Sequence, residues 1–414
     1  MRNLCSYLPI AAVLIFSSAS WSDAQSLTLA GPAAVNSVKP GTPIGEGVFT
    51  NLPFKISASA DAGYDDNVFT SHTDRIGSGY NDLSLDLASH VGNQRARLDA
   101  ELALGFEYYW DTPGTSVYPN ISLNLNSSYR LTPRMILSLS SNLSYQSQPN
   151  FSITGAATQY VGNYFVDSSQ ISLGYELTPR LSTVTSYTLT TYLYENSVEA
   201  TQQNRFEHLI GEQLRYMIFP TVTLVGEYRF GYISYQTTTT GSNTAANSDS
   251  HSHFLLGGAD ATLSPRLSFT FRGGVELRTL LTPGGMETTF PYAESTLSYE
   301  YRPSCFFQWD NRLGLEQSDF AVGQYKEVYR TGIRVDHRFG QKMKAGGSIY
   351  YSYNQYKQPF SFAENDLDAN ATLSYAIDRS LSVQAGYTFT RASSEIVFRD
   401  YYRNKIFLGA SFAF

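Results

Sequence analysis

The sequence is poor in charged residues and in long apolar runs. Asp, Glu, Lys and Arg make up 16% of the 414 residues, below the roughly 25% of ordinary soluble domains. No segment approaches the roughly 20 consecutive apolar residues that a membrane-crossing helix needs. The net charge is −7 and there is no basic block. A helical membrane protein and a nucleic-acid-binding protein are therefore both disfavoured.

Residues typical of catalytic and metal sites are also scarce. The sequence has 2 cysteines, Cys5 and Cys305, and no Walker A, GxGxxG, CxxC or HExxH pattern in a suitable context. We expect Cys305 to be an inert packing residue. His251 and His253 lie in a polar stretch that we expect to be a solvated loop rather than a metal site. No histidine lies in a sequence pattern that identifies a catalytic nucleophile. We therefore predict neither an enzyme nor a cofactor.

Aromatic residues and glycine are plentiful instead. The chain has 31 Tyr, 25 Phe and 31 Gly, yet its mean hydropathy is −0.24. A chain that is rich in aromatics, poor in charge and mildly polar on average suits a sheet with one apolar and one wet face.

The N-terminal residues have the pattern of an export signal. Arg2 precedes a short apolar run at residues 8–16, and Ser22-Asp23-Ala24 fits a cleavage site for a signal peptide. We predict a Sec-type signal peptide at residues 1–24, cleaved near Ala24. Residues 25–52, rich in Ala, Gly, Pro and Val, are predicted to be a flexible periplasmic segment, and residues 53–414 to form the folded domain.

Alternation of apolar and polar residues dominates from residue 53 onward, as in half-buried strands. The clearest stretch is 95–110, with Leu98, Leu102 and Phe106 on one face and Arg97, Asp99 on the other. In a helix, residues i and i+2 would lie on opposite sides. A soluble β-sandwich could show the same alternation, so this pattern alone leaves that alternative open.

The spacing of turns favours a membrane barrel over a sandwich. Tight turns recur about every 40 residues, at Gly92-Asn93, Thr132-Pro133-Arg134, Thr178-Pro179-Arg180, Phe219-Pro220, Ser264-Pro265-Arg266, Arg302-Pro303, Gly340-Gln341 and Asp378-Arg379. Longer polar loops lie between them, as in outer-membrane barrels. We predict an all-β, transmembrane, antiparallel up-and-down barrel of about 18 strands, with 16 as the alternative. Its short turns would be periplasmic and its longer loops would face outward.

Aromatic residues near the turns predict interfacial belts. Four turns follow a Tyr with outward parity, that is, a Tyr that the alternation places on the outer face of the sheet. Other aromatic residues could form the opposite belt. The predicted interface residues are Tyr108, Trp110, Tyr129, Tyr175, Tyr299 and Tyr375, and Tyr192 is placed in the second belt. The final strand carries Ile406, Leu408, Phe412 and Phe414 on one face, and this ending resembles the signal read by the barrel-assembly machinery.

A barrel of this size encloses more space than its side chains fill, and its inward faces carry many charges. Either these charges pair across neighbouring strands, or they line a translocation path. The candidates are Asp86, Arg95, Arg97, Asp99, Glu101, Arg130, Glu227, Arg229, Arg272, Glu276, Asp310, Arg312, Arg330, Arg334, Asp336 and Arg338. Residues 148–170 and 196–212 alternate poorly. His208 and Glu212 have outward parity there, which indicates either a bulge or a different register.

The stretch SASADAGYDDNVFTS, with Gly63, Tyr64, Asp65, Asp66 and Asn67, resembles the start of the putative β-barrel porin 2 family. The Tyr-x-Leu-Thr-Pro-Arg turns and the terminal Phe are also similar to it. Several members sit in exopolysaccharide export systems, so the resemblance implies a polysaccharide exit port as one candidate.

The sequence therefore favours an outer-membrane pore, with a structural or adhesin-type barrel with a plugged lumen as the alternative. The expected partners are outer-membrane lipid, the barrel-assembly machinery, and polysaccharide or small hydrophilic solutes, but no nucleic acid.

Overall fold

The computed structural model describes residues 54–414, apart from residues 115, 148–161, 237–248, 282–284, 321–324 and 358–359. The predicted segments 1–24 and 25–52 lie outside the described residues. Within the described part the chain forms 18 strands. Their bounds are β1 Phe54–Asp65, β2 Ser78–Gly92, β3 Ala96–Tyr109, β4 Val117–Thr132, β5 Met135–Gln146, β6 Tyr164–Thr178, β7 Leu181–Tyr194, β8 Arg205–Phe219, β9 Val222–Tyr235, β10 Ser250–Ser264, β11 Leu267–Leu280, β12 Glu287–Arg302, β13 Cys305–Gln317, β14 Tyr325–Phe339, β15 Met343–Tyr356, β16 Phe362–Ala376, β17 Leu381–Ser394 and β18 Tyr401–Ala413.

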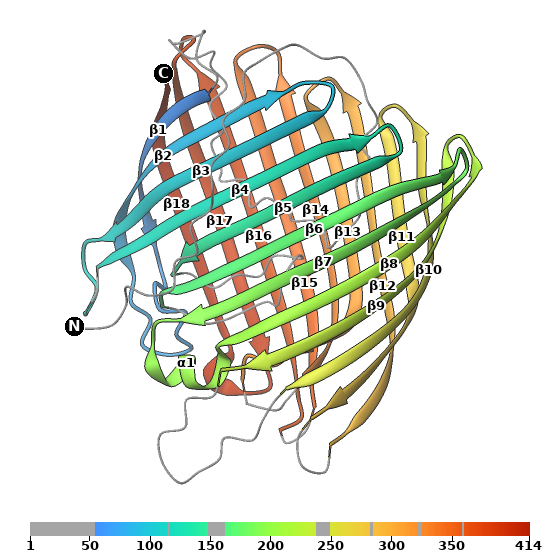
Figure 1. The fold of residues 1–414 in the computed structure, drawn as a ribbon. Helices are drawn as coiled ribbons and strands as arrows, with labels where there is room; N and C mark the ends of the chain where they lie inside the picture. The colour runs from blue at the N-terminus through green and yellow to red at the C-terminus, as the bar shows by residue number, and fades with distance from the viewer. Residues whose placement is uncertain are drawn as a thin grey trace, which may run out of the picture.

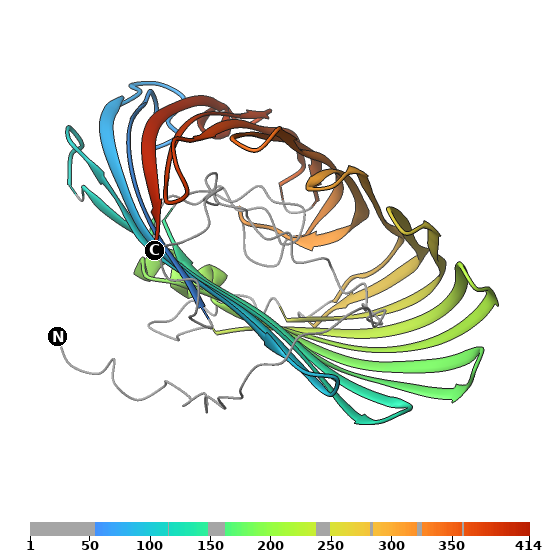
Figure 2. The same cartoon turned by 90° about the horizontal axis from the view of Figure 1, so that it is seen from above.

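The strands close into a single barrel (Figures 1 and 2). Each strand pairs antiparallel with its neighbours in sequence, and β1 also pairs with β18, from Ser57 opposite Ala413 to Asp65 opposite Lys405. Closure satisfies the backbone N–H and C=O groups where no water is present. The predicted barrel and the larger of the two strand counts are confirmed.

Short turns gather at one rim of the barrel, the upper rim in Figure 1, which we call the turn rim. All eight predicted tight turns coincide with these short connections. Thr178 shows why the Thr-Pro-Arg motif reverses the chain, since its Oγ1 accepts hydrogen bonds from the backbone N–H of Arg180 (3.3 Å) and Leu181 (3.1 Å). Thr132 and Ser264 accept equivalent bonds. A side-chain oxygen two residues ahead and a proline together stabilise the turn.

Longer connections lie at the opposite rim, the loop rim. It carries α1 (Ser197–Gln203), whose N-terminal N–H groups are capped by Asn196, and the 3-10 turn η1 (Val397–Arg399). No helix among the described residues is long and apolar enough to cross a membrane.

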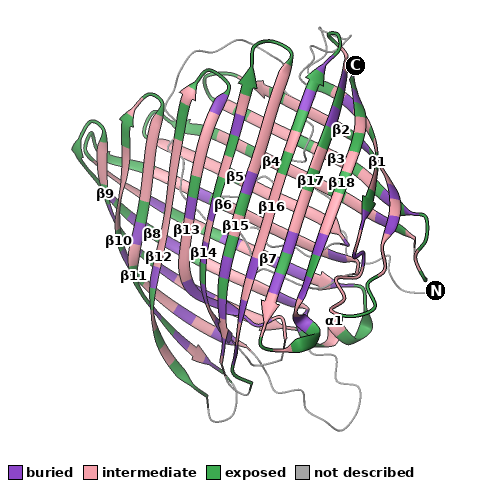
Figure 3. Ribbon diagram, turned by 180° about the vertical axis from the view of Figure 1, so that it is seen from behind, coloured by how far each residue is buried: buried purple, intermediate pink, exposed green. Residues whose placement is uncertain are grey.

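Exposed and buried residues follow one another along many strands (Figure 3). Large apolar side chains are numerous among the exposed residues, and polar and charged side chains are numerous among the buried ones. Many of the buried residues are charged or polar, including Arg272, Glu276 and Arg330. Buried aromatic clusters occur near the loop rim instead of a central apolar core. One contains Tyr80, Tyr109 and Tyr118, and another contains Tyr164, Tyr192 and Tyr194.

The prediction for Tyr192 was therefore wrong. Its ring is 4% exposed and lies inside the barrel, with the Arg205 guanidinium 4.0 Å from the ring centre. In β7 the odd-numbered positions Thr185 and Tyr187 are exposed, so the even-numbered Tyr192 has inward parity. Threonines and tyrosines occupy both the odd- and the even-numbered positions of this strand, so the sequence does not show which of the two sets faces outward.

The poorly alternating stretch before residue 212 contains no bulge. The β7–β8 register runs without a shift from Leu181 opposite Tyr216 to Tyr192 opposite Arg205. Glu212 is exposed and belongs to the outward set. His251 and His253 were expected in a solvated loop, but β10 begins at Ser250, so both lie on that strand.

Candidate functional site in the barrel interior

The inner face of the barrel carries most of the charged residues that the sequence placed there. Arg95 is the exception, because β3 begins at Ala96 and Arg95 lies in the turn before it. The other predicted residues lie on strands with inward parity. They are Asp86, Arg97, Asp99, Glu101, Arg130, Glu227, Arg229, Arg272, Glu276, Asp310, Arg312, Arg330, Arg334, Asp336 and Arg338.

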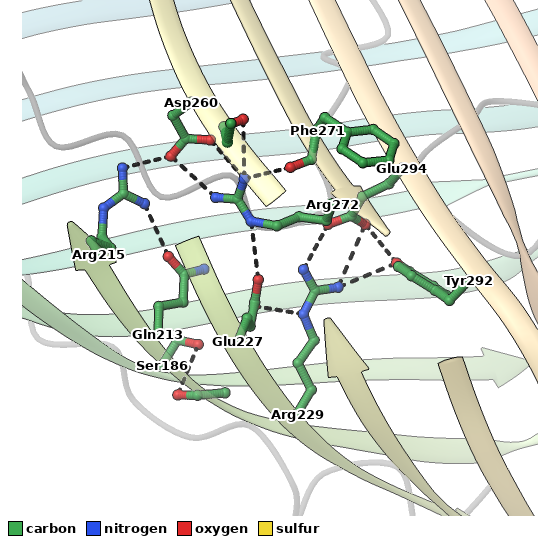
Figure 4. A network of polar contacts seen from close by, with 12 residues as sticks. Ser186, Gln213, Arg215, Glu227, Arg229, Asp260, Phe271, Arg272, Tyr292 and Glu294 are labelled. Atoms are coloured by element: carbon green, nitrogen blue, oxygen red, sulfur yellow. Dashed lines mark hydrogen bonds and ion pairs between the residues drawn. The ribbon is translucent and has the colours of Figure 1, made fainter. Parts of the chain in front are cut away.

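A continuous chain of ion pairs crosses the inner face from β8 to β12 (Figure 4). Arg272 on β11 is 1% exposed. It holds Asp260 of β10 through two hydrogen bonds of 2.7 and 3.1 Å, and its Nε lies 3.3 Å from Glu227 of β9. Asp260 also accepts a hydrogen bond from Arg215 of β8 at 2.6 Å.

The chain continues through Arg229. Its Nε donates to Glu227 at 2.6 Å, and its Nη2 donates to Glu294 of β12 at 2.6 Å. Tyr292 completes the end of the chain by donating to Glu294 at 2.5 Å. Positive and negative groups thus alternate over five strands. Each buried guanidinium is matched by a carboxylate, and removing one partner of such a pair costs about 3–5 kcal/mol.

A second group of ion pairs lies towards the loop rim on β11, β13 and β14. Arg278 bonds Glu276, and Arg330 donates to Glu316 at 2.5 Å. Arg312 is less tightly held, since its Nη1 lies 3.9 Å from Glu316. Pairing with carboxylates of the same or another strand therefore accounts for most of the buried arginines on this wall.

The wall formed by β4–β7 has a different lining, which is mostly uncharged apart from residues near the turn rim such as Arg130. Its inward side chains bond one another across strands as amides and hydroxyls. The amide of Asn142 bonds Asn124, Ser140 donates to Asn126 at 2.8 Å, and Gln170 donates to Thr188 at 3.0 Å. The interior thus has one ion-paired wall and one mostly neutral polar wall, which we call the neutral wall.

The loop rim is fastened by buried polar contacts between separate loops. Arg399 of η1 donates to Glu364 on β16 at 2.8 Å and to Asp319, which follows β13, at 3.2 Å. Tyr356 also donates to Asp319 at 2.6 Å. Burial by itself raises the pKa of Asp319, but the cations Lys326 and Arg399 outweigh burial and hold that pKa well below its usual range.

The predicted interface aromatics lie on the outside of the barrel. Tyr108, Trp110, Tyr129, Tyr175, Tyr299 and Tyr375 are all exposed. Trp110 donates to Asn81 at 2.8 Å. Ile406, Leu408, Phe412 and Phe414 are exposed too, and the rings of Phe412 and Phe414 pack edge to face.

Sequence reasoning missed several members of the interior networks. Arg215, Asp260 and Glu294 were not singled out, although each has the parity of the predicted residues beside it. The sequence gives Tyr350 and Phe407 inward parity, but the buried tyrosines near the loop rim, such as Tyr109 and Tyr118, were also missed. Adjacent aromatic pairs were the available signal, because in Tyr108-Tyr109 one ring has to face inward.

The two histidines considered for a metal have other partners. His253 Nδ1 lies 2.8 Å from the Tyr228 hydroxyl, and the rings of His251 and His253 pack edge to face. Among the described residues, no group of three or more His, Cys, Asp or Glu is arranged to hold a metal ion.

Comparisons with solved structures find several chains that are similar to this one at low sequence identity. OccK5 (OpdH) of Pseudomonas aeruginosa has a TM-score of 0.40 at 12% identity, covering 87% of this chain and 98% of that one. The outer membrane protein OpdK of Pseudomonas aeruginosa has a TM-score of 0.43 at 10% identity, and the match covers 87% of this chain and 99% of that one. OccAB3 of Acinetobacter baumannii has a TM-score of 0.40 at 10% identity, and the match covers 87% of this chain and 99% of that one. No curated protein sequence matches this chain significantly.

The family comparison covers the whole barrel. Residues 40–414 match the sequence profile of the family described as "Putative beta-barrel porin 2". This span includes every strand of the barrel, from β1 to β18. The chain belongs to this family, and it is a porin-like outer-membrane β-barrel.

Proposed function

We propose that this protein is a passive aqueous channel for small hydrophilic solutes. The observation that carries the proposal is the polarity of the inner face on both walls. Ion pairs line β8–β14, and amides and hydroxyls line β4–β7. Such side chains stay hydrated or pair with one another, and an apolar filling would be expected if the interior were a packed core.

The outer face supports insertion in a membrane with the strands spanning it. Leucine, isoleucine and phenylalanine are exposed along the strands, and tyrosines lie near the turn rim at Tyr129, Tyr175, Tyr299 and Tyr375. Aromatic rings favour the boundary between lipid and water. Bacterial barrels keep their short turns on the periplasmic side, so the turn rim would face the periplasm and α1 the outside.

The pairing of charges suggests weak ion selectivity. Arg272, Arg229 and Arg330 each hold a carboxylate within 2.7 Å. Because these cations are neutralised in place, they would not form a free row of positive charge for anions. The neutral wall offers amides and hydroxyls that can exchange hydrogen bonds with water and with polar solutes. Small neutral solutes therefore suit this lining.

Export of an exopolysaccharide finds less support in the lining. Sugar rings stack on accessible aromatic faces. The inward aromatics near the loop rim are packed among themselves instead. Tyr109 and Tyr164 are both fully buried, and their rings contact Tyr118 and Tyr194 respectively.

Single-channel recording in a planar bilayer tests the proposal. The folded protein, identified by its heat-modifiable gel migration, is expected to give a steady conductance that neutral sugars of small size reduce while they occupy the lumen. A folded protein that stays electrically silent would contradict the channel and favour the plugged or structural barrel. Blocking by long acidic oligosaccharides, but not by small sugars, would instead favour polysaccharide export.

A further inference from the structure

Glu212 is a charged residue at the middle of the outer face. It is the central residue of β8, seven positions from each end of Arg205–Phe219, and its side chain is exposed on the outward side. Its carboxylate accepts a hydrogen bond of 2.6 Å from the Thr185 hydroxyl on β7. Mid-strand positions on the far side of the barrel, such as Ala369 on β16 and Ile406 on β18, carry apolar outward residues.

Polar aromatic pairs surround Glu212 towards the loop rim. Tyr187 and His208 form a hydrogen bond of 2.8 Å, and so do Tyr228 and His253. The His208 ring also stacks against Tyr232. We call this outward group the β7–β10 patch, and its members are Thr185, Tyr187, His208, Glu212, Tyr228, Tyr232 and His253.

The surface beside Glu212 is level. Gly226 on β9 lies opposite Gly257 on β10, and a Cβ added at either position would meet no atom within 4 Å. Two glycines side by side on an outward face leave the backbone open to close approach by another chain.

Lipid chains are a poor environment for this patch. Facing hydrocarbon, the Glu212 carboxylate would lose its hydration and keep only the hydroxyl donor of Thr185. Ionisable residues in membrane segments usually face protein or water. A protein surface with hydrogen-bond donors would satisfy Glu212. The patch itself contains such donors, because in the tautomer in which Tyr187 donates to Nδ1 of His208, the Nε2 atom carries a hydrogen.

A surface that holds both an acceptor and donors is complementary to a second copy of itself. Symmetric contacts between identical chains need this property, because the same residues appear on both sides. We propose that the β7–β10 patch is the contact surface between two copies of this chain in the membrane. Glu212 of one copy accepts hydrogen bonds from imidazole and phenol groups of the other, across the level surface at Gly226 and Gly257.

Cysteine cross-linking in native outer membranes tests the contact. In a Cys305→Ser background, Leu214→Cys and Gly257→Cys are placed beside the patch and are called the patch cysteines, and Ala369→Cys at the middle of β16 is the matched control. A short bifunctional maleimide is expected to give a band of twice the chain mass with a patch cysteine and none with Ala369→Cys. Absence of that band with both patch cysteines, an equal band from the control, or an adduct with a different protein would overturn the proposal.

Substitution of Glu212 separates a protein contact from a lipid contact. Glu212→Leu is expected to weaken association of the purified protein in mild detergent by about tenfold or more, equivalent to losing one charge-assisted hydrogen bond. Glu212→Gln, which keeps hydrogen bonding, should retain more of it, and Ala369→Leu should change nothing. Heat-modifiable migration confirms that each variant folds. If Glu212→Leu leaves association unchanged and raises the unfolding temperature, Glu212 faces lipid and the proposal fails.

Discussion

Arg403 on β18 and Asp65 on β1 form a buried ion pair across the seam where the last strand meets the first. The Arg403 Nε lies 3.0 and 2.9 Å from the two carboxylate oxygens of Asp65. The Tyr109 hydroxyl on β3 donates to Asp65 at 3.0 Å and accepts from Arg403 at 3.2 Å. Lys405 and Glu107 form a second ion pair beside it. The seam is thus held by side chains as well as by the β1–β18 backbone ladder.

We expect Arg403→Met to destabilise the closed barrel by about 3 kcal/mol, because Asp65 would stay buried without a cation. The unfolding midpoint, followed by heat-modifiable migration, should fall. The double variant Asp65→Leu with Arg403→Met should recover much of the loss, since no buried charge is then left unpaired. If the single and double variants lose the same stability, the pair does not hold the seam in this way.

Neighbouring positions on β4 test the two faces of the wall. Leu123→Arg places a charge on the outer face and should cost about 2–4 kcal/mol of stability in a bilayer. Ser122→Arg, one residue earlier, points into the interior and should cost far less. Urea unfolding in lipid vesicles measures both. Equal losses would contradict the assignment of the faces.

The contact between Arg399 and Asp319 predicts a pH dependence at the loop rim. Because the folded pKa of Asp319 is lowered, its stabilising effect is complete at neutral pH. The effect begins to be lost below the unfolded value of about 4, as the unfolded chain takes up a proton, and continues to fall towards the folded pKa. Asp319→Asn should therefore lower the free energy of unfolding at pH 7 by about 2–3 kcal/mol.

The difference between Asp319→Asn and the unchanged protein should narrow as the pH falls from about 5 to 2, as for other paired carboxylates. Measurements of thermal unfolding in detergent at several pH values would show this. A difference that stays constant over this range would show that the charge of Asp319 does not stabilise the contact.

Local chemistry explains what the sequence could predict of the fold. Turns such as Thr178-Pro179-Arg180 carry their own stabilising side-chain hydrogen bonds, so they can be recognised without knowing any neighbour. Period-two alternation similarly follows from the pleat of a single strand. Both signals depend on residues that are close in the chain, and together they predicted the strand count.

The interior networks depend on residues far apart in the chain and could not be predicted in the same way. Arg215 and Asp260 meet only because β9 lies between their strands in a particular register. Arg403 and Asp65 are separated by 338 positions. Parity places each residue on the correct wall, but partners on non-adjacent strands are set by register, strand tilt and side-chain length.

Thiol modification during single-channel recording tests the central claim most directly. In a Cys305→Ser background, Glu101→Cys places a thiol on the inner face and Leu102→Cys places one on the outer face of β3. We expect a bulky aqueous thiol reagent to reduce the conductance of Glu101→Cys in discrete steps and to leave Leu102→Cys unchanged. A folded protein that does not conduct, or that responds equally at both positions, would contradict a water-filled channel lined by these residues.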